Sequence, residues 1–410
     1  MKNNSKNLNE KNILEIIKKY KTPLWIYDSN TIKERINQLK KFDSIRFAQK
    51  ACSNIHILKI MKENKVKVDA VSEGEIERAI AAGYNPEKDI VFTSDLFETD
   101  QLIKKIISLK ITVNIGSINM LEQLGKLSPG HKIWLRINPK FGYGHNEKTN
   151  TGGENSKHGI WNIQESLSYI KKYKFQLIGI HMHIGSGINI NNLKKVCKKM
   201  METVFNFKQK IKFISTGGGF SIPYKQNEKK FNIDNFFKIW DKTRNKISQY
   251  FGNPIKLEIE PGRFLVAESG ILVSTVRSIK KMGKKKYTLV NVGFNELIRP
   301  VLYGSYHHIS IIKKNKEKSI KMVKTIIGGP LCESGDIFTQ TKKKMTASRL
   351  LPKPEIGDYV IFHDTGAYGS SMSSNYNSRP LIPEILIENK NFKIIRKKQT
   401  FKEMLMLENI

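Results

Sequence analysis

The strongest constraint on the fold is an alternation of two patterns between residues 45 and 260. Short stretches rich in β-branched residues are separated by segments with helical periodicity, such as "SEGEIERAIAAG", which has Ser72 and Glu75 at capping-box spacing and stops at Gly83. Eight strand–helix repeats predict a closed parallel (β/α)8 barrel, with a doubly wound open sheet as the alternative. The strand-like stretches are 45–49, 66–70, 89–92, 111–115, 132–137, 177–183, 211–215 and 255–260.

The pattern changes after about residue 270, where strand-like segments such as "KYTLVNVG" and "GDYVIFHDTGAYG" follow one another without helices. This predicts an all-β second domain, a sandwich or a Greek-key barrel. The segment "PLWIYD" (23–28) precedes the first barrel strand and is expected to add a strand to this domain. We therefore predict a barrel over residues 29–270 and a β-domain built from residues 1–28 and 271–410.

The chain is strongly basic, with 71 Lys and Arg against 37 Asp and Glu and a formal net charge of +34. Such a charge makes nucleic acid or an acidic membrane a candidate partner. The lysines, however, are scattered over turns such as "KKNKEK" and "TKKKM" and form no single stripe with interleaved aromatic residues. Solvated faces are the favoured interpretation, and a nucleic-acid-binding protein remains a remote alternative.

Cysteine usage and hydropathy indicate the compartment. The three cysteines lack disulfide-like spacing, the N-terminal segment is polar, and no apolar run is long enough to span a bilayer. We expect a soluble cytoplasmic protein without a membrane partner.

Reactive side chains and glycines gather where the predicted strands end. In a (β/α)8 barrel these carboxyl ends form one rim, which carries the active site. The rim residues are Lys50, Asp69, Arg136, His183, the triplet "GGG" (217–219) and "EPGR" (260–263).

Lys50 lies in an otherwise apolar run, "RFAQKACSN". Its neighbours Ala48 and Cys52 are small and leave room at the barrel mouth. A partly desolvated amine in this position loses its proton readily and can form a Schiff base. The alternative is a surface lysine that extends its ammonium group into water.

The remaining rim residues indicate which kind of ligand could bind at this amine. "STGGGF" allows backbone N–H groups to approach an anion, although a tight turn is the alternative. Glu260 provides the acid that a protonated pyridine nitrogen needs, as in pyridoxal phosphate, and Arg263 can bind phosphate or carboxylate.

Two histidines in "HMHIGSG", His181 and His183, fall on one strand face, so a pair of metal ligands is an alternative interpretation. A metal site would need further ligands. We expect His183 to stack on a flat cofactor ring with Ser186 near its phosphate, and His181 to be a core histidine.

Seven motifs in order resemble the bacterial diaminopimelate decarboxylases, which share fold-type III with eukaryotic ornithine decarboxylase and alanine racemase. The resemblance covers residues from about 20 to 385. Its motifs are "FAQKACSN", "HMHIGSG", "STGGGFS", "EPGR", "NELIRPVLYGSYH", "GPLCESGD" and "HDTGAYGSSMSSNYNSRP".

The resemblance implies a pyridoxal-phosphate-dependent carboxy-lyase that converts meso-2,6-diaminopimelate into L-lysine and CO2 through a Schiff base with the cofactor. It makes Lys50 the attachment site and Cys332 the proton donor; the alternative for Cys332 is a small buried apolar residue. It also implies a homodimer in which the "CES" segment completes the partner's site. The implied cofactor-binding residues are Lys50, His183, Ser186, Gly219, Glu260, Pro261, Gly262, Arg263 and Tyr368.

The distal amino-acid head of the substrate needs a site for one carboxylate and one ammonium group. Arg299 can bind the carboxylate, Tyr303 can donate a hydrogen bond, and Glu333 can accept from the ammonium group. Arg263 and Tyr368 complete the implied substrate site. The alternative function is an ornithine- or arginine-type decarboxylase. The alternative role for Arg299 is an interface salt bridge.

One position departs from the family pattern. Lys140 in "NPKFGYGH" stands where a glycine is common. We expect it on a loop outside the site; otherwise substrate access is in doubt.

Overall fold

The computed structural model describes residues 7–143, 150–185, 190–207, 209–314, 321–341 and 345–408. The chain divides into two compact units. The first, here called the barrel unit, comprises Arg35–Ser221 and Lys230–Phe264, and the second, the β-unit, comprises Met1–Glu34, Ile222–Lys229 and Leu265–Ile410.

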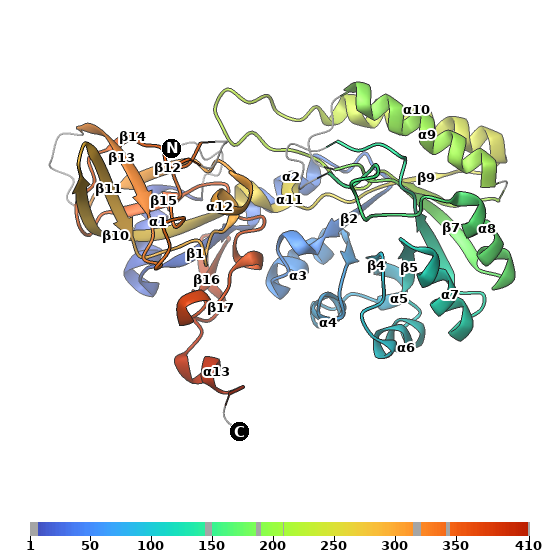
Figure 1. Ribbon diagram of the computed structural model, residues 1–410, viewed down its shortest axis with the longest axis horizontal. Coiled ribbons are helices and arrows are strands. Elements are labelled where there is room, and N and C mark those ends of the chain that lie inside the picture. Colours follow the sequence, from blue (N-terminus) through green and yellow to red (C-terminus); the bar gives the residue numbers. More distant parts are fainter. Residues whose placement is uncertain are drawn as a thin grey trace. The chain divides into compact units, whose positions relative to one another are not determined.

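The barrel unit contains a closed barrel of eight parallel strands in sequence order, which confirms the predicted (β/α)8 fold over the open sheet (Figure 1). The first strand pairs with the last through Ser44 and Glu258, and this pairing closes the barrel. The strands are β2 (Ser44–Ala48), β3 (Lys67–Ala70), β4 (Ile90–Ser94), β5 (Thr112–Ile115), β6 (Lys132–Arg136), β7 (Gln176–His181), β8 (Phe213–Ser215) and β9 (Lys256–Ile259).

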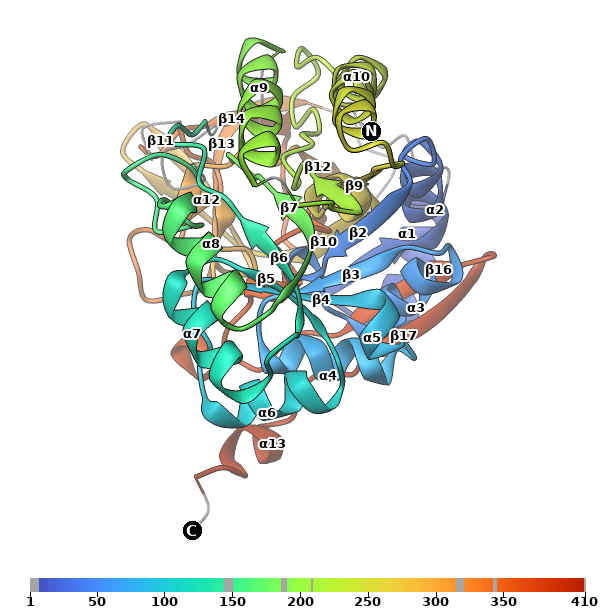
Figure 2. The same ribbon diagram turned by 90° about the vertical axis from the view of Figure 1, so that its right-hand side faces the viewer.

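Helices lie outside these strands, as Figure 2 shows for α4, α7 and α8. The longer ones bury an apolar face; the helix that follows β4, for example, buries Leu102, Ile103 and Ile106. The helices are α3 (Ile55–Glu63), α4 (Glu73–Ala81), α5 (Pro86–Asp89), α6 (Asp100–Ser108), α7 (Ile118–Leu127), α8 (Ile163–Lys172), α9 (Ile190–Phe207) and α10 (Ile233–Phe251).

The start of α4 differs in detail from the expected capping box. Ser72 is the N-cap and its hydroxyl accepts from the backbone N–H of Glu75, as predicted. The carboxylate of Glu75 instead accepts from the backbone N–H of Val71 at 2.8 Å. Its acidic group is therefore tied to the segment that leaves β3.

The β-unit is built on a nine-stranded mixed sheet, and the segment 23–28 contributes a strand to it, as expected. That strand, β1, pairs with β10 on one side and β16 on the other. The strands are β1 (Leu24–Asp28), β10 (Gly270–Met282), β11 (Lys285–Val290), β12 (Ile309–Ile312), β13 (Met322–Gly328), β14 (Arg349–Pro352), β15 (Tyr359–Phe362), β16 (Glu384–Glu388) and β17 (Asn391–Arg396).

Helices were not expected in this unit. The first, α1 (Glu10–Tyr20), buries Ile13, Ile16 and Ile17 in the same apolar cluster as β1. The others are α2 (Ser29–Asn37), α11 (Arg263–Val266), α12 (Arg299–Tyr303) and α13 (Phe401–Leu405), of which α2 and α11 cross the unit boundaries. No helix in the described part of the chain is long and apolar enough to cross a membrane.

A buried ion pair joins the first and last barrel strands. Arg46 on β2 is 3% exposed and Glu258 on β9 is fully buried. The guanidinium donates to both carboxylate oxygens, at 2.6 and 3.2 Å, and to the carbonyls of Val68 and Asp89. Because two parallel hydrogen bonds fix the geometry, the pair helps to hold the strands where the barrel closes.

Replacing Glu258 with alanine leaves the buried guanidinium of Arg46 without its carboxylate. We expect the free energy of unfolding to fall by about 3–5 kcal/mol, because an unpaired buried charge is costly. Chemical denaturation followed by circular dichroism measures this loss. Glu87→Ala is the matched control, since its ion pair with Lys132 is exposed, and it should leave stability almost unchanged. Equal losses in both variants would contradict the interpretation.

Candidate active site

Lys50 lies directly after β2, in the 3-10 turn Gln49–Ala51, and not on the strand itself. Its side chain is exposed, whereas Ala48 and Cys52 beside it are buried. The expected partial desolvation is therefore not found in the single chain. The turn is held in place by Gln49, whose side-chain amide donates to the carbonyl of Glu75 at 3.1 Å.

Two acidic groups close to Lys50 have raised pKa values. Burial raises the pKa of Asp69, at the end of β3, to about 6; the negative charge of Glu260 adds to this effect, and Lys50 opposes it. Burial likewise raises the pKa of Glu75 to about 7, again against the charge of Lys50. Around neutral pH these two acids can therefore hold or release a proton near the amine.

Glu260, which follows β9, is buried and ionised. Ser215 Oγ donates to Oε1 at 2.7 Å, and Nε2 of His181 lies 2.9 Å from Oε2. Burial alone would raise the pKa of Glu260, but the charge of His181 and these hydrogen-bonding partners outweigh it and lower the pKa to about 2. Glu260 was predicted from the sequence as a site residue, but its partner Ser215 was not, and His181 was expected to be an ordinary core residue.

His181 is 1% exposed, as expected of a core residue, but it faces an acid. The strand β7 ends at His181, so His183 lies beyond it and the two do not form a pair on one strand face. Within the described residues no group of three or more His, Cys, Asp or Glu side chains is arranged to hold a metal ion.

The glycine triplet packs against His183 and Glu260. Gly217 has φ +66°, and a Cβ there would lie 2.5 Å from Cβ of His183. A Cβ on Gly218 would lie 2.5 Å from the carbonyl oxygen of Glu260. Gly219 also has a positive φ, +95°. Side chains are thus sterically excluded from this turn, which packs closely against His183 and Glu260.

His183 is electrically neutral. Burial lowers its pKa well below the ordinary value, and the positive charge of Arg136 lowers it further. Its Nδ1 is buried and makes no hydrogen bond within the described residues. Since Ser186 lies outside the described part of the chain, its predicted phosphate contact stays a prediction.

The "EPGR" segment connects Glu260 to the turn of Lys50. The carbonyl of Pro261 accepts from the backbone N–H of Ala48 at 3.3 Å. Gly262 packs so closely that a Cβ there would lie 3.2 Å from Cβ of Ala51. Arg263 follows at the start of α11 and is half-buried. The barrel unit therefore brings together the predicted residues Lys50, His183, Gly219, Glu260, Pro261, Gly262 and Arg263 on one rim.

A network at the same rim was not anticipated from the sequence. Asp95, directly after β4, lies 2.5 Å from Nδ1 of His158 and accepts from the backbone N–H of Gly159 at 2.8 Å. Burial alone would raise the pKa of Asp95, but these contacts outweigh that effect and lower it. In the same connection between β6 and α8, Thr151 donates to the carbonyl of His183 at 3.0 Å. No local sequence pattern pairs Asp95 with His158, which is 63 positions away.

The remaining predicted residues belong to the β-unit. Arg299 begins α12 and is 3% exposed, and Tyr303 ends the same helix half-buried. Tyr368 is half-buried with φ +57°, an unusual conformation for a bulky residue. Such strain is common at functional sites.

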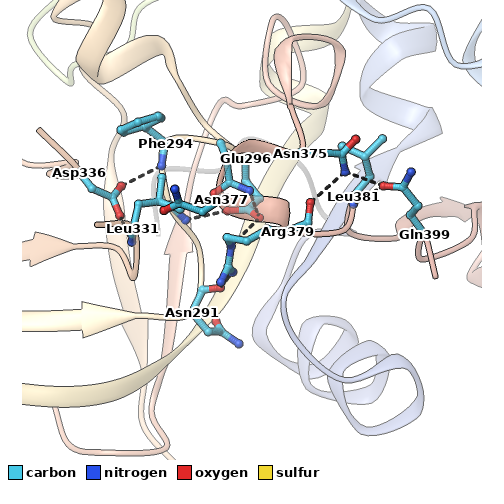
Figure 3. Close-up of polar contacts among 12 residues, drawn as sticks. Asn291, Phe294, Glu296, Leu331, Asp336, Asn375, Asn377, Arg379, Leu381 and Gln399 are labelled. Carbon is cyan, nitrogen blue, oxygen red and sulfur yellow. Dashed lines mark hydrogen bonds and ion pairs between the residues drawn. The ribbon is translucent and has the colours of Figure 1, made fainter. Parts of the chain in front are cut away.

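Cys332 lies on a turn that is exposed but firmly held. The buried carboxylate of Asp336 accepts from the backbone N–H groups of Phe294 and Leu331, both at 2.8 Å (Figure 3). The backbone N–H of Cys332 donates to the side chain of Asn377 at 3.2 Å. The thiol is therefore presented to solvent, which rules out the alternative of a small buried residue in the single chain.

Glu333 on this turn is also exposed and accepts a short hydrogen bond from the hydroxyl of Tyr376. The ring of Tyr376 stacks on Phe294 with centroids 5.4 Å apart. Figure 3 shows Arg379 nearby, whose guanidinium donates to the carbonyl of Asn291 at 2.9 Å. The carboxylate of Glu333 thus has a defined orientation despite its exposure.

Lys140 is exposed on a loop, and its backbone conformation explains why glycine is common at this position. Its φ of +72° is a left-handed conformation that glycine adopts at little cost. The ammonium group lies over the ring of Trp161, 5.0 Å from the centroid. This cation–π contact offsets part of the backbone strain.

Comparison with known proteins identifies the family. A family model described as "Pyridoxal-dependent decarboxylase, pyridoxal binding domain" matches residues 29–267. Diaminopimelate decarboxylase of Buchnera aphidicola subsp. Schizaphis graminum is 60% identical over 405 residues, which cover 98% of this chain and 97% of the relative. The chain belongs to the diaminopimelate decarboxylase family. The enzyme of that name from Escherichia coli is 52% identical over 408 residues, covering 98% of this chain and 97% of the relative.

Solved structures of diaminopimelate decarboxylases share the fold along nearly the whole chain. One has a TM-score of 0.95 and 52% identity, and covers 98% of this chain and 97% of its own. The Helicobacter pylori enzyme in complex with L-lysine has a TM-score of 0.83 and 30% identity, and covers 97% and 99%. The cofactor of this family is pyridoxal phosphate. The rim fits it, because it combines an exposed amine, an ionised acid, a neutral imidazole and a turn without side chains at Gly217, Gly218 and Gly219.

The raised pKa of Asp69 predicts how stability depends on pH. The folded protein holds this proton more tightly than the unfolded chain, so the stabilisation is present below about pH 4 and is lost as pH rises to about 6. Asp69→Asn removes this dependence. The quantity to compare is the free energy of unfolding of the wild type minus that of the variant. We expect this difference to be ~2–3 kcal/mol lower at about pH 8 than at about pH 4.

Chemical denaturation at the two pH values measures this difference. Glu98→Gln is the control, because this side chain is exposed, and it should show no such pH dependence. A constant difference between wild type and Asp69→Asn would contradict a raised pKa of Asp69 in the folded protein.

Proposed function

We propose that this protein decarboxylates meso-2,6-diaminopimelate with pyridoxal phosphate and releases L-lysine and CO2, the last step of lysine biosynthesis. The observation that carries the proposal is the buried, ionised Glu260, held by Ser215 and His181 beside a glycine turn on the barrel rim. The names of relatives 49–60% identical to this chain support the choice of substrate.

The rim residues divide the task of holding the cofactor. Lys50 supplies the amine for covalent attachment, and its exposure leaves that amine accessible. Neutral His183 offers a flat ring for stacking, and Gly219 with the "EPGR" segment and Ser186 would bind the phosphate. Glu260 remains ionised and can hold a proton on the pyridine nitrogen. When bound, the cofactor supplies an electron-accepting ring, which stabilises the negative charge left by departing CO2.

Proton transfer requires one group near the amine and another near the substrate carbon. The raised pKa values of Asp69 and Glu75 suit them to exchange a proton with Lys50 around neutral pH. Cys332 is the proposed donor to the substrate carbon. Its thiol is exposed on a turn fixed by Asp336, so it combines access with a defined position.

Selectivity for diaminopimelate is assigned to the β-unit. Arg299 would bind the distal carboxylate, with Tyr303 as a further hydrogen-bond donor. The carboxylate of Glu333, already oriented by Tyr376, would accept from the distal ammonium group. Arg263 and Tyr368 would contact cofactor and substrate together.

The exposed turn also supports a homodimer. Cys332, Glu333, Ser334 and Gly335 are all exposed in the single chain, although Cys332 and Glu333 are assigned to chemistry. We therefore propose that the β-domain (residues 1–28 and 271–410) completes the site of the partner's barrel (residues 29–270). The three free cysteines agree with a reducing cytoplasm.

The function is tested by CO2 release from meso-diaminopimelate, with and without added pyridoxal phosphate. We expect activity that requires the cofactor, and visible absorption that borohydride removes. Lys50→Ala should lose both, whereas Lys59→Ala, at an exposed helical lysine, should retain both. A protein that releases CO2 from ornithine or arginine but not from diaminopimelate would overturn the substrate assignment.

Arg299→Ala should weaken binding of the distal carboxylate. Because a charge-assisted hydrogen bond is lost, we expect KM for diaminopimelate to rise by roughly ten- to a hundredfold. Steady-state kinetics measure this, with Arg277→Ala as control because Arg277 is exposed on β10. Unchanged kinetics for Arg299→Ala would favour the structural salt bridge as its role.

A further inference from the structure

A histidine that the proposed function does not use holds the guanidinium of Arg299. Nη1 of Arg299 lies 2.9 Å from Nε2 of His307 and 3.1 Å from the hydroxyl of Tyr224. Arg299 and His307 are 3% and 2% exposed. The contact is therefore shielded from water, and its hydrogen-bonding roles must be satisfied within the protein.

These contacts define the protonation state of His307. Because a guanidinium can only donate, Nε2 of His307 must accept and carries no proton. The proton is then on Nδ1, which lies 2.9 Å from the carbonyl oxygen of His363 and donates to it. The neutral Nδ1–H tautomer is thus the only form of His307 that makes both hydrogen bonds.

We infer that His307 is a positioning residue for Arg299, and that protonation of His307 releases the arginine and weakens binding of the distal carboxylate. This inference rests on the proposed function and adds a pH-sensitive element to it. A second proton on His307 would replace an acceptor with a donor that faces a guanidinium. The hydrogen bond would be lost, and two positive charges would oppose each other out of water.

The groups around His307 favour its neutral form. Arg299 approaches its ring, and Arg349 donates a hydrogen bond to its backbone carbonyl. Arg349 also lies over the ring of Tyr306, as does Lys225. The titratable groups on the packed segments are Tyr224, Lys225, Arg299, Tyr303, Tyr306, His308, Arg349, His363 and Asp364.

His363 is itself fixed by a neighbour. Its Nε2 lies 2.7 Å from Oγ of Ser310, and its ring centroid lies 5.2 Å from that of His308. The carbonyl that accepts from His307 therefore belongs to a residue with a defined position. Both ends of the His307 imidazole are held by groups that move little independently.

The test compares His307→Gln and His307→Leu with the wild-type holoenzyme. A glutamine oxygen can accept from Arg299 but does not titrate, and leucine cannot accept. In the wild type, we expect the Kd for L-lysine and the KM for diaminopimelate to rise roughly tenfold or more between about pH 8 and about pH 5.5, with kcat changed less.

The Gln variant should bind L-lysine with near wild-type affinity at high pH and lose most of this rise. The Leu variant should bind weakly at every pH. Because other groups of the site titrate in this range, the decisive quantity is the difference in pH dependence between wild type and His307→Gln. L-lysine is the probe because it retains the distal amino-acid head of the substrate.

His131→Gln is the matched control, since this barrel histidine bonds to the carbonyl of Ile111 and has no assigned role. It should keep the wild-type pH dependence. Thermal unfolding midpoints of all variants show whether they are folded. Identical pH profiles for wild type and His307→Gln, or wild-type affinity in folded His307→Leu, would overturn the inference. A wild type that releases no CO2 from diaminopimelate would instead overturn the proposed function.

Discussion

The site depends on keeping one buried carboxylate ionised. Removing Glu260 from water favours its neutral form, and the nearby His181 and the hydrogen bond from Ser215 are the main interactions that reverse that preference. The three residues come from the ends of β7, β8 and β9, whose register places His181 beside Ser215 on neighbouring strands. A parallel closed barrel is therefore more than a scaffold, because it brings these strand ends together at the spacing that the charge requires.

The same negative charge affects its surroundings. Asp69 is also buried; burial and the negative charge of Glu260 raise its pKa, whereas His181 and Ser215 lower the pKa of Glu260. This separation gives the rim one permanent negative charge and one acid that titrates near neutrality. Lys50 lies within the influence of Asp69 and Glu75, so the protein can adjust the proton of the amine without changing the charge at Glu260.

Much of this arrangement could be predicted from the sequence. Eight alternations gave the barrel, and the rule that sites lie at carboxyl strand ends gave Lys50 and Glu260. The roles of His181 and Ser215 were missed, because a strand pattern shows which face a residue occupies but not which neighbour it meets across the barrel. Lys50 was placed on a strand because the apolar run continues past Ala48, where the backbone instead turns. The left-handed backbone of Lys140 could not be read from a lysine.

The second unit orders an exposed group by different means. Burial orders side chains in the barrel, whereas Cys332 is exposed. Its turn is ordered through the backbone instead: Asp336 is buried beneath it and accepts two backbone N–H groups, while Asn377 accepts a third. Because these bonds fix the main chain, the exposed thiol of Cys332 has a defined position within the single chain, as its proposed role of proton donor requires.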